Sequence, residues 1–448
     1  MKIGLIAMSG VRAASEELNK IGLTLPGVVE RNKIVASLPS LSLLTLAAYI
    51  PSHFEIEYHE IADLRKQPAL PEGFDLVAIA SYSAQVKDAY RVADHYRARG
   101  AAAVMGGLHV TSLPDEAAMH CTSIAVGEGE LVWPQILADF EQGRLQPRYD
   151  APRGQHFDLA NSRMPRFDLL DIDKYNRLTV QTSRGCPHLC DFCASSILLT
   201  PKYVVKPVEL VIAEIRRIKE LWPKPFIEFA DDNSFAMKGH YKRLLAALRD
   251  EQIKWFTEAD ISIADDPDLL DLMRESGCRQ VLIGLESPRG GGLNGIETRG
   301  NWKLKVLPKY EIAVKAIQSR GITVNGCFIL GLDGDDEQTF DEIYDFADRV
   351  GLFEVQLTVL TPFPGTPLYA RLLGENRILD PGAWEKCTLF DVNYVPRNMS
   401  PERLQSGLVE LGRRMYAPDF VQRRRERFFE VLHASGHYRA ARANLPLN

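Results

Sequence analysis

Three cysteines, Cys186, Cys190 and Cys193, lie within eight residues of one another in the segment TSRGCPHLCDFCASS. Thiolates are strong ligands for zinc and for iron–sulfur clusters. A structural zinc site requires four ligands, and no second pair of Cys or His at zinc-binding spacing follows this segment. His188 lies inside the loop beside Pro187, which makes it a poor fourth ligand. Three thiolates suit a four-iron cluster with one iron open to a substrate or cofactor, and zinc binding or simple electron transfer is the alternative.

The other features of the composition predict a cytoplasmic protein. The apolar run in the N-terminal segment MKIGLIAMSG is too short for a signal peptide. No apolar segment of the sequence reaches the length of a transmembrane helix, so no stable membrane insertion is expected. The net charge of −6 disfavours a general nucleic-acid surface. The basic run RRRERFF near the end of the chain is expected to be a solvated helix face. Four further cysteines are scattered in apolar contexts and are expected to be buried: Cys121, Cys278, Cys327 and Cys387.

The elements that carry the cysteines form a series of alternating strands and helices. Six strand-like runs begin near Thr179, Pro225, Lys254, Arg279, Thr323 and Phe353, and amphipathic helices separate them. Six units are fewer than the eight of a closed barrel, so an open six-stranded (β/α)6 barrel is predicted. The cysteines follow the first strand. Four carboxylates lie at the carboxyl ends of later strands, where such folds place their chemistry: Asp231, Asp232, Glu258 and Glu286.

The first 145 residues also alternate, with strand-like runs at 2–8, 54–61, 75–83, 101–107 and 123–130. This pattern predicts an α/β domain of the Rossmann-like type, a doubly wound parallel sheet with helices on both faces. The predicted organisation is this sheet over 1–145, a linker over 146–176 rich in Pro, Arg and Asp, the barrel over 177–367, and a mainly helical region over 368–448. Ligands of parallel sheets bind beyond the strands' carboxyl ends. Those ends carry SYSAQ, GGLHVT and GEGE.

The cysteine spacing, with Phe192 before the third cysteine and a six-unit β/α series around it, resembles the radical S-adenosylmethionine (SAM) superfamily. The resemblance implies that the three cysteines hold a [4Fe–4S] cluster, whose open iron binds the amino and carboxylate groups of SAM. It also implies an electron donor such as flavodoxin or ferredoxin. By the same resemblance Phe192 lies at the cofactor, Asp231 and Asp232 are candidates for the methionine amine, and Glu258 and Glu286 are candidates for the ribose or polar end of SAM. The alternative for each carboxylate is a helix cap or salt bridge. Arg184 either offsets the thiolates' charge or forms a structural salt bridge.

The sheet placed before this barrel resembles the cobalamin-binding members of the superfamily, and LTPFPGTPLY and the C-terminal region resemble the group that includes hopanoid C-methylases. Glycines at the strand ends let backbone approach a large ring closely. The expected cobalamin contacts are Tyr82, Ser83, Gln85, Gly106, Gly107, His109, Val110, Thr111, Gly127, Glu128 and Gly129. His109 is expected to contact a cofactor amide, with cobalt ligation as the alternative. A dinucleotide-type domain is a further alternative, but no Gly-x-Gly-x-x-Gly follows the first strand.

The resemblance implies a C-methyltransferase that cleaves SAM reductively and methylates an unactivated carbon of a small molecule through methylcobalamin. No catalytic side chain is assigned, because the cofactors carry the difficult steps. A cyclase, a rearrangement enzyme or an oxidoreductase with the same cofactors is the alternative, and a non-catalytic cobalamin-binding regulator is another. A lipid, polyketide or pigment-like substrate is expected if four aromatic residues line an apolar pocket: Phe363, Tyr369, Trp384 and Tyr394.

Overall fold

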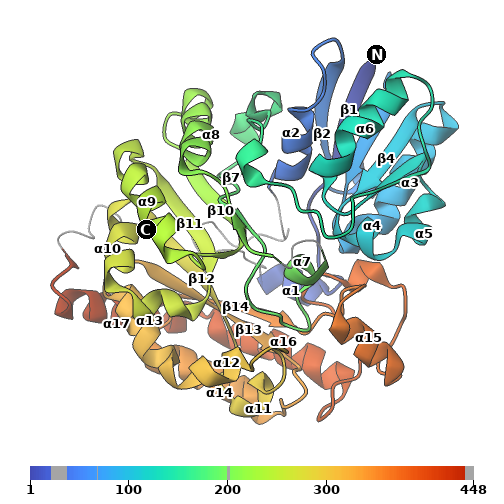
Figure 1. Cartoon of the computed structure of the whole chain (residues 1–448). Helices are drawn as coiled ribbons and strands as arrows, with labels where there is room; N and C mark the ends of the chain where they lie inside the picture. The colour runs from blue at the N-terminus through green and yellow to red at the C-terminus, as the bar shows by residue number, and fades with distance from the viewer. Residues whose placement is uncertain (22–37, 68, 199–201, 439–448) are drawn as a thin grey trace.

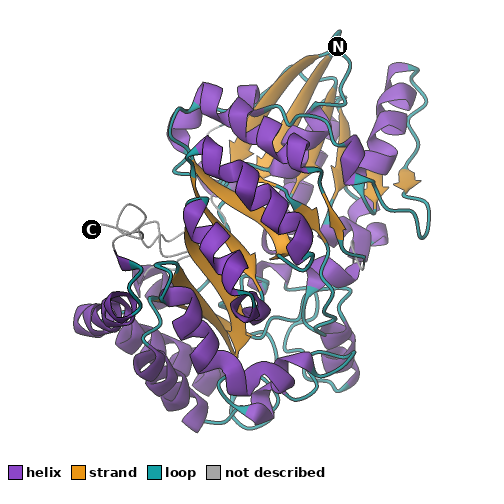
Figure 2. Cartoon of the chain, turned by 60° about the vertical axis from the view of Figure 1, so that its left-hand side comes forward, coloured by secondary structure: helices purple, strands orange, loops and turns teal. Residues whose placement is uncertain are grey.

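The computed structural model describes residues 1–21, 38–67, 69–198 and 202–438 of the chain. Two six-stranded sheets stand side by side, an N-terminal one in blue to cyan and a second one in green to orange, with the C-terminal helices beneath them (Figure 1). Helices cover both faces of the N-terminal sheet and the outer face of the second sheet (Figure 2). The predicted fold class is confirmed.

The N-terminal sheet is entirely parallel, with the order β2-β1-β3-β4-β5-β6. Its strands are β1 (Lys2–Met8), β2 (Glu55–Ile61), β3 (Leu76–Ala80), β4 (Ala102–Gly106), β5 (Ser123–Val126) and β6 (Arg148–Asp150). The helices of this half are α1 (Glu16–Ile21), α2 (Leu41–Ala47), α3 (Val86–Ala98), α4 (Leu108–Ser112), α5 (Pro114–Ala118) and α6 (Gly129–Glu141). The first five strands match the predicted runs, whereas β6 falls within the stretch predicted as a linker.

Alternate residues of the strands feed two separate cores, as expected for a sheet buried on both faces. On β3, Leu76 and Ala78 pack against α2 and α6, and Val77 and Ile79 pack against α3. The sheet is therefore doubly wound. Its strand order reverses between β1 and β3, and parallel sheets bind ligands at the carboxyl ends near such a reversal.

The second sheet is also parallel, with the order β14-β13-β12-β11-β10-β7. Its strands are β7 (Leu178–Val180), β10 (Phe226–Ser234), β11 (Lys254–Ala259), β12 (Cys278–Glu286), β13 (Thr323–Leu330) and β14 (Glu354–Val359). The connecting helices are α7 (Ala194–Leu198), α8 (Val208–Leu221), α9 (Lys238–Leu248), α10 (Pro267–Glu275), α11 (Gly290–Leu293), α12 (Trp302–Val306), α13 (Tyr310–Gln318) and α14 (Gln338–Val350). A short antiparallel pair, β8 (Ser183–Arg184) and β9 (Val204–Val205), stands apart from it. The edges β7 and β14 are not paired with each other, which gives the predicted open six-stranded barrel.

Local sequence signals explain where α10 begins and ends. The Asp266 side chain accepts a hydrogen bond from the amide of Leu269 (3.1 Å), and Pro267 occupies the first turn. Gly277 follows the helix with φ +96°, and a Cβ there would clash with the carbonyl oxygen of Ile253. Only glycine fits this turn, which sends the chain directly into β12.

The C-terminal region consists of α15 (Pro367–Gly374), α16 (Pro401–Met415) and α17 (Pro418–Ala434). The basic run predicted to be a solvated face lies on α17. One of its members, Arg424, is fully buried and donates to the carbonyl oxygens of Leu352, Phe353 and Met415. Within the described ranges no helix is both long and apolar enough to cross a membrane.

Candidate cofactor site between the two sheets

The cysteine loop is anchored to β10 by Asp231. This buried carboxylate accepts hydrogen bonds from the amides of Thr182 (2.7 Å) and Ser183 (2.8 Å) and from the Tyr241 hydroxyl (3.0 Å). The Thr182 and Ser234 hydroxyls also donate to it. Burial raises its pKa, and these hydrogen bonds oppose the rise. Asp231 therefore ties the end of β7 to β10, and its predicted contact with SAM stays a prediction.

Asp232, the next residue, holds the cysteine loop at both ends. Its carboxylate accepts the amide of Gly185 (2.7 Å), just before the first cysteine, and the hydroxyl of Ser195, just after the third. The two neighbouring carboxylates thus fix the path of the loop by different contacts.

The three thiols form a donor set that suits an iron–sulfur cluster. Asn233 Nδ2 donates to Cys186 Sγ (3.6 Å) and Ser196 Oγ donates to Cys193 Sγ (3.5 Å). Hydrogen bonds of this kind stabilise thiolate sulfur. Burial raises the pKa of Cys186 to about 11 and also raises that of Cys190, so binding a cation is what would keep these sulfurs deprotonated. In the described part of the chain, no three His, Cys, Asp or Glu side chains are placed to hold a single metal ion.

His188, inside the cysteine loop, contacts Asp260 and Trp302. Its Nε2 lies 3.2 Å from Asp260 Oδ2, and its ring stacks on Trp302 with centroids 4.1 Å apart. Asn233 Nδ2 also donates to Asp260 (2.9 Å). Burial opposes ionisation of Asp260, but the hydrogen bonds from His188 and its other donors outweigh it and lower the pKa of that carboxyl.

Glu258 and Glu286 end neighbouring strands but differ in environment. Glu258 has no hydrogen-bond or ion-pair partner among the described residues, and its carboxylate reaches solvent inside the barrel. Enclosure by the barrel raises its pKa to about 8, with the charge of Glu228 as the next cause. Glu286 is buried, has φ +61°, and accepts a hydrogen bond from Lys303 Nζ (2.9 Å). Of the two, Glu258 is the carboxylate left open for a ligand.

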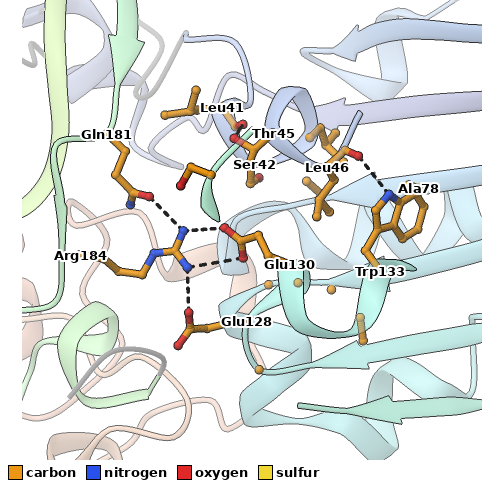
Figure 3. A pocket seen from close by; sticks show the side chains of 18 of the residues that line it. Leu41, Ser42, Thr45, Leu46, Ala78, Glu128, Glu130, Trp133, Gln181 and Arg184 are labelled. Atoms are coloured by element: carbon orange, nitrogen blue, oxygen red, sulfur yellow. Dashed lines mark hydrogen bonds and ion pairs between the residues drawn. The ribbon is translucent and has the colours of Figure 1, made fainter. Parts of the chain in front are cut away.

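A cavity of about 380 Å³ lies where the carboxyl ends of the two sheets meet (Figure 3). Five of the predicted cobalamin contacts line it, together with one predicted SAM contact: Gly106, Gly107, Gly127, Glu128, Gly129 and Asp232. Gly107 and Gly127 have φ values of +99° and +90°, which favour glycine. The two sheets predicted to carry separate cofactors therefore share one cavity.

Arg184 crosses this cavity from the cysteine loop to the N-terminal sheet. Its guanidinium donates to Glu128 (2.8 Å), Glu130 (2.6 Å) and the side-chain oxygen of Gln181 (2.9 Å), as the dashed lines in Figure 3 show. Burial opposes its charge, but the two carboxylates raise the pKa of Arg184. Of the two roles considered for Arg184, the structure forms the salt bridge.

The remaining predicted contacts do not line the cavity. They are Tyr82, Ser83, Gln85, His109, Val110, Thr111, Phe192, Asp231, Glu258 and Glu286. Tyr82 is 51% exposed; partial enclosure raises its pKa, and the nearby charges of Glu228 on β10 and Glu60 on β2 add to this, so it faces the space between the sheets. Thr111 supports the cavity indirectly, because its hydroxyl accepts the amide of Gly127 (3.0 Å).

His109 and Gln85 point into the N-terminal domain. His109 is buried, its Nε2 lies 3.3 Å from Glu116, and its Nδ1 has no partner in the described chain. Burial lowers its pKa. Gln85 donates to the Ser9 carbonyl oxygen (2.8 Å). Cofactor contact by these two residues stays a prediction.

Several residues that line the cavity were not predicted from the sequence. On the N-terminal side they come from α2, α6 and the segment before η4 (Phe167–Leu169): Leu41, Ser42, Leu43, Thr45, Leu46, Trp133, Ser162 and Arg163. On the barrel side they are Gln181 after β7, Ser195 on α7 and Lys206 after β9. Helix α2 is a largely apolar run, LSLLTLA, and the edge of it that lines the cavity carries no recognisable motif. Two of the aromatic residues expected at a substrate pocket are core residues instead: Tyr394 is fully buried and donates to Gly331, and Trp384 donates to Glu116 (3.1 Å).

Comparison with known proteins identifies the second half of this arrangement. A radical SAM superfamily model matches residues 180–347, from β7 through the three cysteines into α14. A domain of unknown function, DUF4070, matches residues 366–446.

Curated relatives match most of the chain. Bacteriochlorophyllide d C-12(1)-methyltransferase of Chlorobaculum tepidum is 28% identical over 394 residues, covering 86% of this chain and 84% of that protein. Hopanoid C-2 methylase of Rhodopseudomonas palustris is 26% identical, covering 77% of this chain and 66% of that protein.

A solved structure extends the likeness to the whole fold. The radical SAM methyltransferase TsrM of Kitasatospora setae, with cobalamin and a [4Fe–4S] cluster bound, superposes with a TM-score of 0.66 at 15% identity, covering 97% of this chain and 99% of that one. The family match spans the cysteine loop and the open barrel just described, so residues 180–347 form a radical SAM domain, and such a domain implies SAM and a [4Fe–4S] cluster as cofactors.

Proposed function

We propose that this protein is a cobalamin-dependent radical SAM C-methyltransferase. One observation carries the proposal: a single cavity is built from the glycine-rich ends of β4 and β5 on one side and from Asp232 and Ser195 of the cysteine-loop anchor on the other. A methyl carrier and a radical source placed at the same cavity would both reach one substrate carbon. The relatives named as methyltransferases support this reading.

The residues at the N-terminal side fit a large, flat, amide-bearing cofactor such as cobalamin. Gly106 and Gly107 leave the backbone open to close approach, and a Cβ at Gly107 would meet nothing within 4 Å. Ser42, Thr45 and Arg163 add hydroxyl and guanidinium groups that would hold peripheral amides. Methylcobalamin would supply the methyl group there, and the cluster with SAM would supply the 5′-deoxyadenosyl radical.

The protein's own part in this reaction is positioning and exclusion of water. Asp231 and Asp232 fix the cysteine loop, and Glu258 offers an open carboxylate to a hydroxyl or ammonium group of SAM. No acid–base pair is required, because abstraction of a hydrogen atom uses the radical.

We propose further that the substrate is a small apolar molecule of the pigment or polycyclic lipid class, as the names of the two relatives suggest. An electron donor of the flavodoxin or ferredoxin type would reduce the cluster.

The test uses protein purified without oxygen and reconstituted with iron, sulfide and hydroxocobalamin. SAM with a deuterated methyl group, a strong reductant and a lipid and pigment extract are added, and products are followed by mass spectrometry. Products heavier by one labelled methyl, formed together with 5′-deoxyadenosine, are expected. Cys190→Ala is the matched control and is expected to abolish both. Sustained 5′-deoxyadenosine formation that depends on the extract, without transferred label, would refute methyl transfer and favour a cyclase or redox reaction.

A further inference from the structure

We propose that Arg184 is a positioning residue that sets the distance and angle between the cobalamin cradle and the cluster loop; this rests on the proposed function. Arg184 belongs to the cysteine loop by sequence, two residues before Cys186. Its hydrogen-bond acceptors Glu128 and Glu130 belong to the loop after β5 and the first turn of α6.

The acceptor side is itself held rigidly. Glu128 stands between Gly127 and Gly129, both of which line the cavity. Its other contacts are His156 Nδ1 (2.9 Å) and the amide of Phe157 (3.1 Å). The Glu128 carboxylate is therefore held in place by other contacts and would not follow a shift of the Arg184 guanidinium.

The cysteine side is equally constrained. Gly185 follows Arg184, and its amide donates to Asp232 (2.7 Å), which also binds the far end of the loop through Ser195. Gln181, which precedes the loop, accepts from the same guanidinium (2.9 Å). The Arg184 side chain thus links Glu128 and Glu130, beside the glycine cradle, to Gln181, which precedes the cysteine loop (Figure 3).

The positioning role of Arg184 depends on the geometry of its hydrogen bonds and not on its charge alone. The side chains are nearly enclosed, with exposures of 16% for Arg184, 5% for Glu128 and 10% for Glu130. Two carboxylates outnumber the one guanidinium, so the group carries no net positive charge to offer to the cluster. The planar fork of arginine donates to both acceptors at once, which a lysine ammonium reproduces poorly.

The consequence is a coupling role. Methyl transfer requires the radical carbon and the methyl donor to meet at near-attack distance, and an error of about 1 Å costs on the order of 100-fold in rate. SAM cleavage needs only the barrel side. Loss of the Arg184 bridge should therefore separate the two events.

The experiment compares Arg184→Met, Arg184→Lys and Glu130→Gln with the matched control Arg148→Met. Arg148 also forms a two-pronged pair, with Asp150 (2.7 and 2.8 Å), but on the exposed strand β6 and away from the cavity. Labelled product per 5′-deoxyadenosine is expected to fall about 10- to 100-fold in Arg184→Met and nearly as far in Arg184→Lys, with cluster absorbance kept. The double variant Arg184→Met/Glu130→Gln should be no worse than Arg184→Met. Arg148→Met should match the wild type.

A second readout uses the cofactor-free chain and needs no turnover. Hydrogen exchange of the amides in 126–131 and 181–186 is expected to rise together in Arg184→Met and to stay unchanged in Arg148→Met. Unchanged exchange in both segments, or a wild-type product ratio in Arg184→Met, would overturn the positioning role. A ratio restored fully by Arg184→Lys would assign the effect to charge. If the wild-type protein transfers no methyl group, the proposed function fails on its own, and the exchange experiment still decides whether Arg184 joins the two sides.

Discussion

At the residue scale, carboxylates of the same type have different environments and different uses. Asp231 and Asp232 are adjacent, yet one joins two strands and the other joins both ends of the cysteine loop. Glu286 is neutralised by Lys303, whereas Glu258 has no partner within the described ranges. From the sequence, Asp231 and Asp232 were candidates for the methionine amine of SAM, and Glu258 and Glu286 for its ribose or polar end. The four carboxylates differ in burial and in the number of hydrogen-bond donors around them, and both properties depend on the fold.

Replacing Glu258 with Gln is expected to change how stability depends on pH. The folded pKa of Glu258, about 8, lies above its usual value of 4.5, so the folded state holds the proton more tightly than the unfolded state. Its contribution to folding is therefore present below pH 4.5 and is lost as the pH rises from about 4.5 to 8. The Tm of Glu258→Gln relative to wild type should increase between pH 5 and pH 9. Thermal melts of the cofactor-free protein measure this.

Glu220→Gln is the control, because Glu220 is exposed and pairs with Arg217 on the surface of α8. A Tm difference for Glu258→Gln that stays flat across this pH range, as for the control, would contradict the raised pKa.

At the element scale, the cavity depends on strand-to-helix turns that only glycine can make. Gly127 follows β5 with φ +90°, and a Cβ on it would lie 2.8 Å from the Cβ of Ala151. Its amide donates to Thr111, which follows β4, so the two glycine-rich turns support each other. The glycine at position 127 is thus required by packing against Ala151, and the cofactor contact expected for the GEGE motif stays a prediction.

Gly127→Ala is expected to destabilise the protein by ~2 kcal/mol, since a left-handed φ and a steric overlap act together. Cobalamin affinity, measured by spectrophotometric titration with hydroxocobalamin, should fall with it. Gly239→Ala is the matched control: Gly239 lies in α9 without a left-handed φ, and nothing lies within 4 Å of a Cβ there. The free energy of unfolding of Gly239→Ala should be higher than that of the wild type by about 0.5–1 kcal/mol. Equal behaviour of the two variants would show that the turn is not constrained.

At the scale of the whole molecule, the C-terminal region holds the two sheets together. Asp391 accepts the amide of Ala14 near the N-terminal sheet. Arg371 on α15 lies 3.4 Å from Asp191, between the second and third cysteines. The helix α17 packs on α13 and α14 of the barrel. Residues matched by the domain of unknown function thus contact the barrel and the segment that follows β1 of the N-terminal sheet.

Arg424→Met is expected to lower the stability by ~3 kcal/mol, because the carbonyl groups of Leu352, Phe353 and Met415 would lose a charged donor in a buried place. Differential scanning calorimetry measures the change. The neighbouring Arg423→Met should cost less than about 1 kcal/mol, since Arg423 pairs with Asp348 at the surface. A similar Tm for the two variants would mean that burial of Arg424 does not anchor α17.

The sequence alone predicted the layout of the fold and, through its resemblance to the radical SAM superfamily, the cofactors. Three thiols at fixed spacing are a local feature, and the alternation of strands and helices is a short-range pattern of buried faces, so both are legible along the chain. Only the tertiary structure decided which distant groups meet. Arg184 bonds to Glu130, which lies 54 residues away in the sequence, and residues of α2 line the cavity. The strand β6 extends the N-terminal sheet although it lies in the stretch predicted as a linker, and Arg424 is buried although it belongs to a basic run. These pairings depend on how complete elements pack against each other, and no local periodicity carries that information.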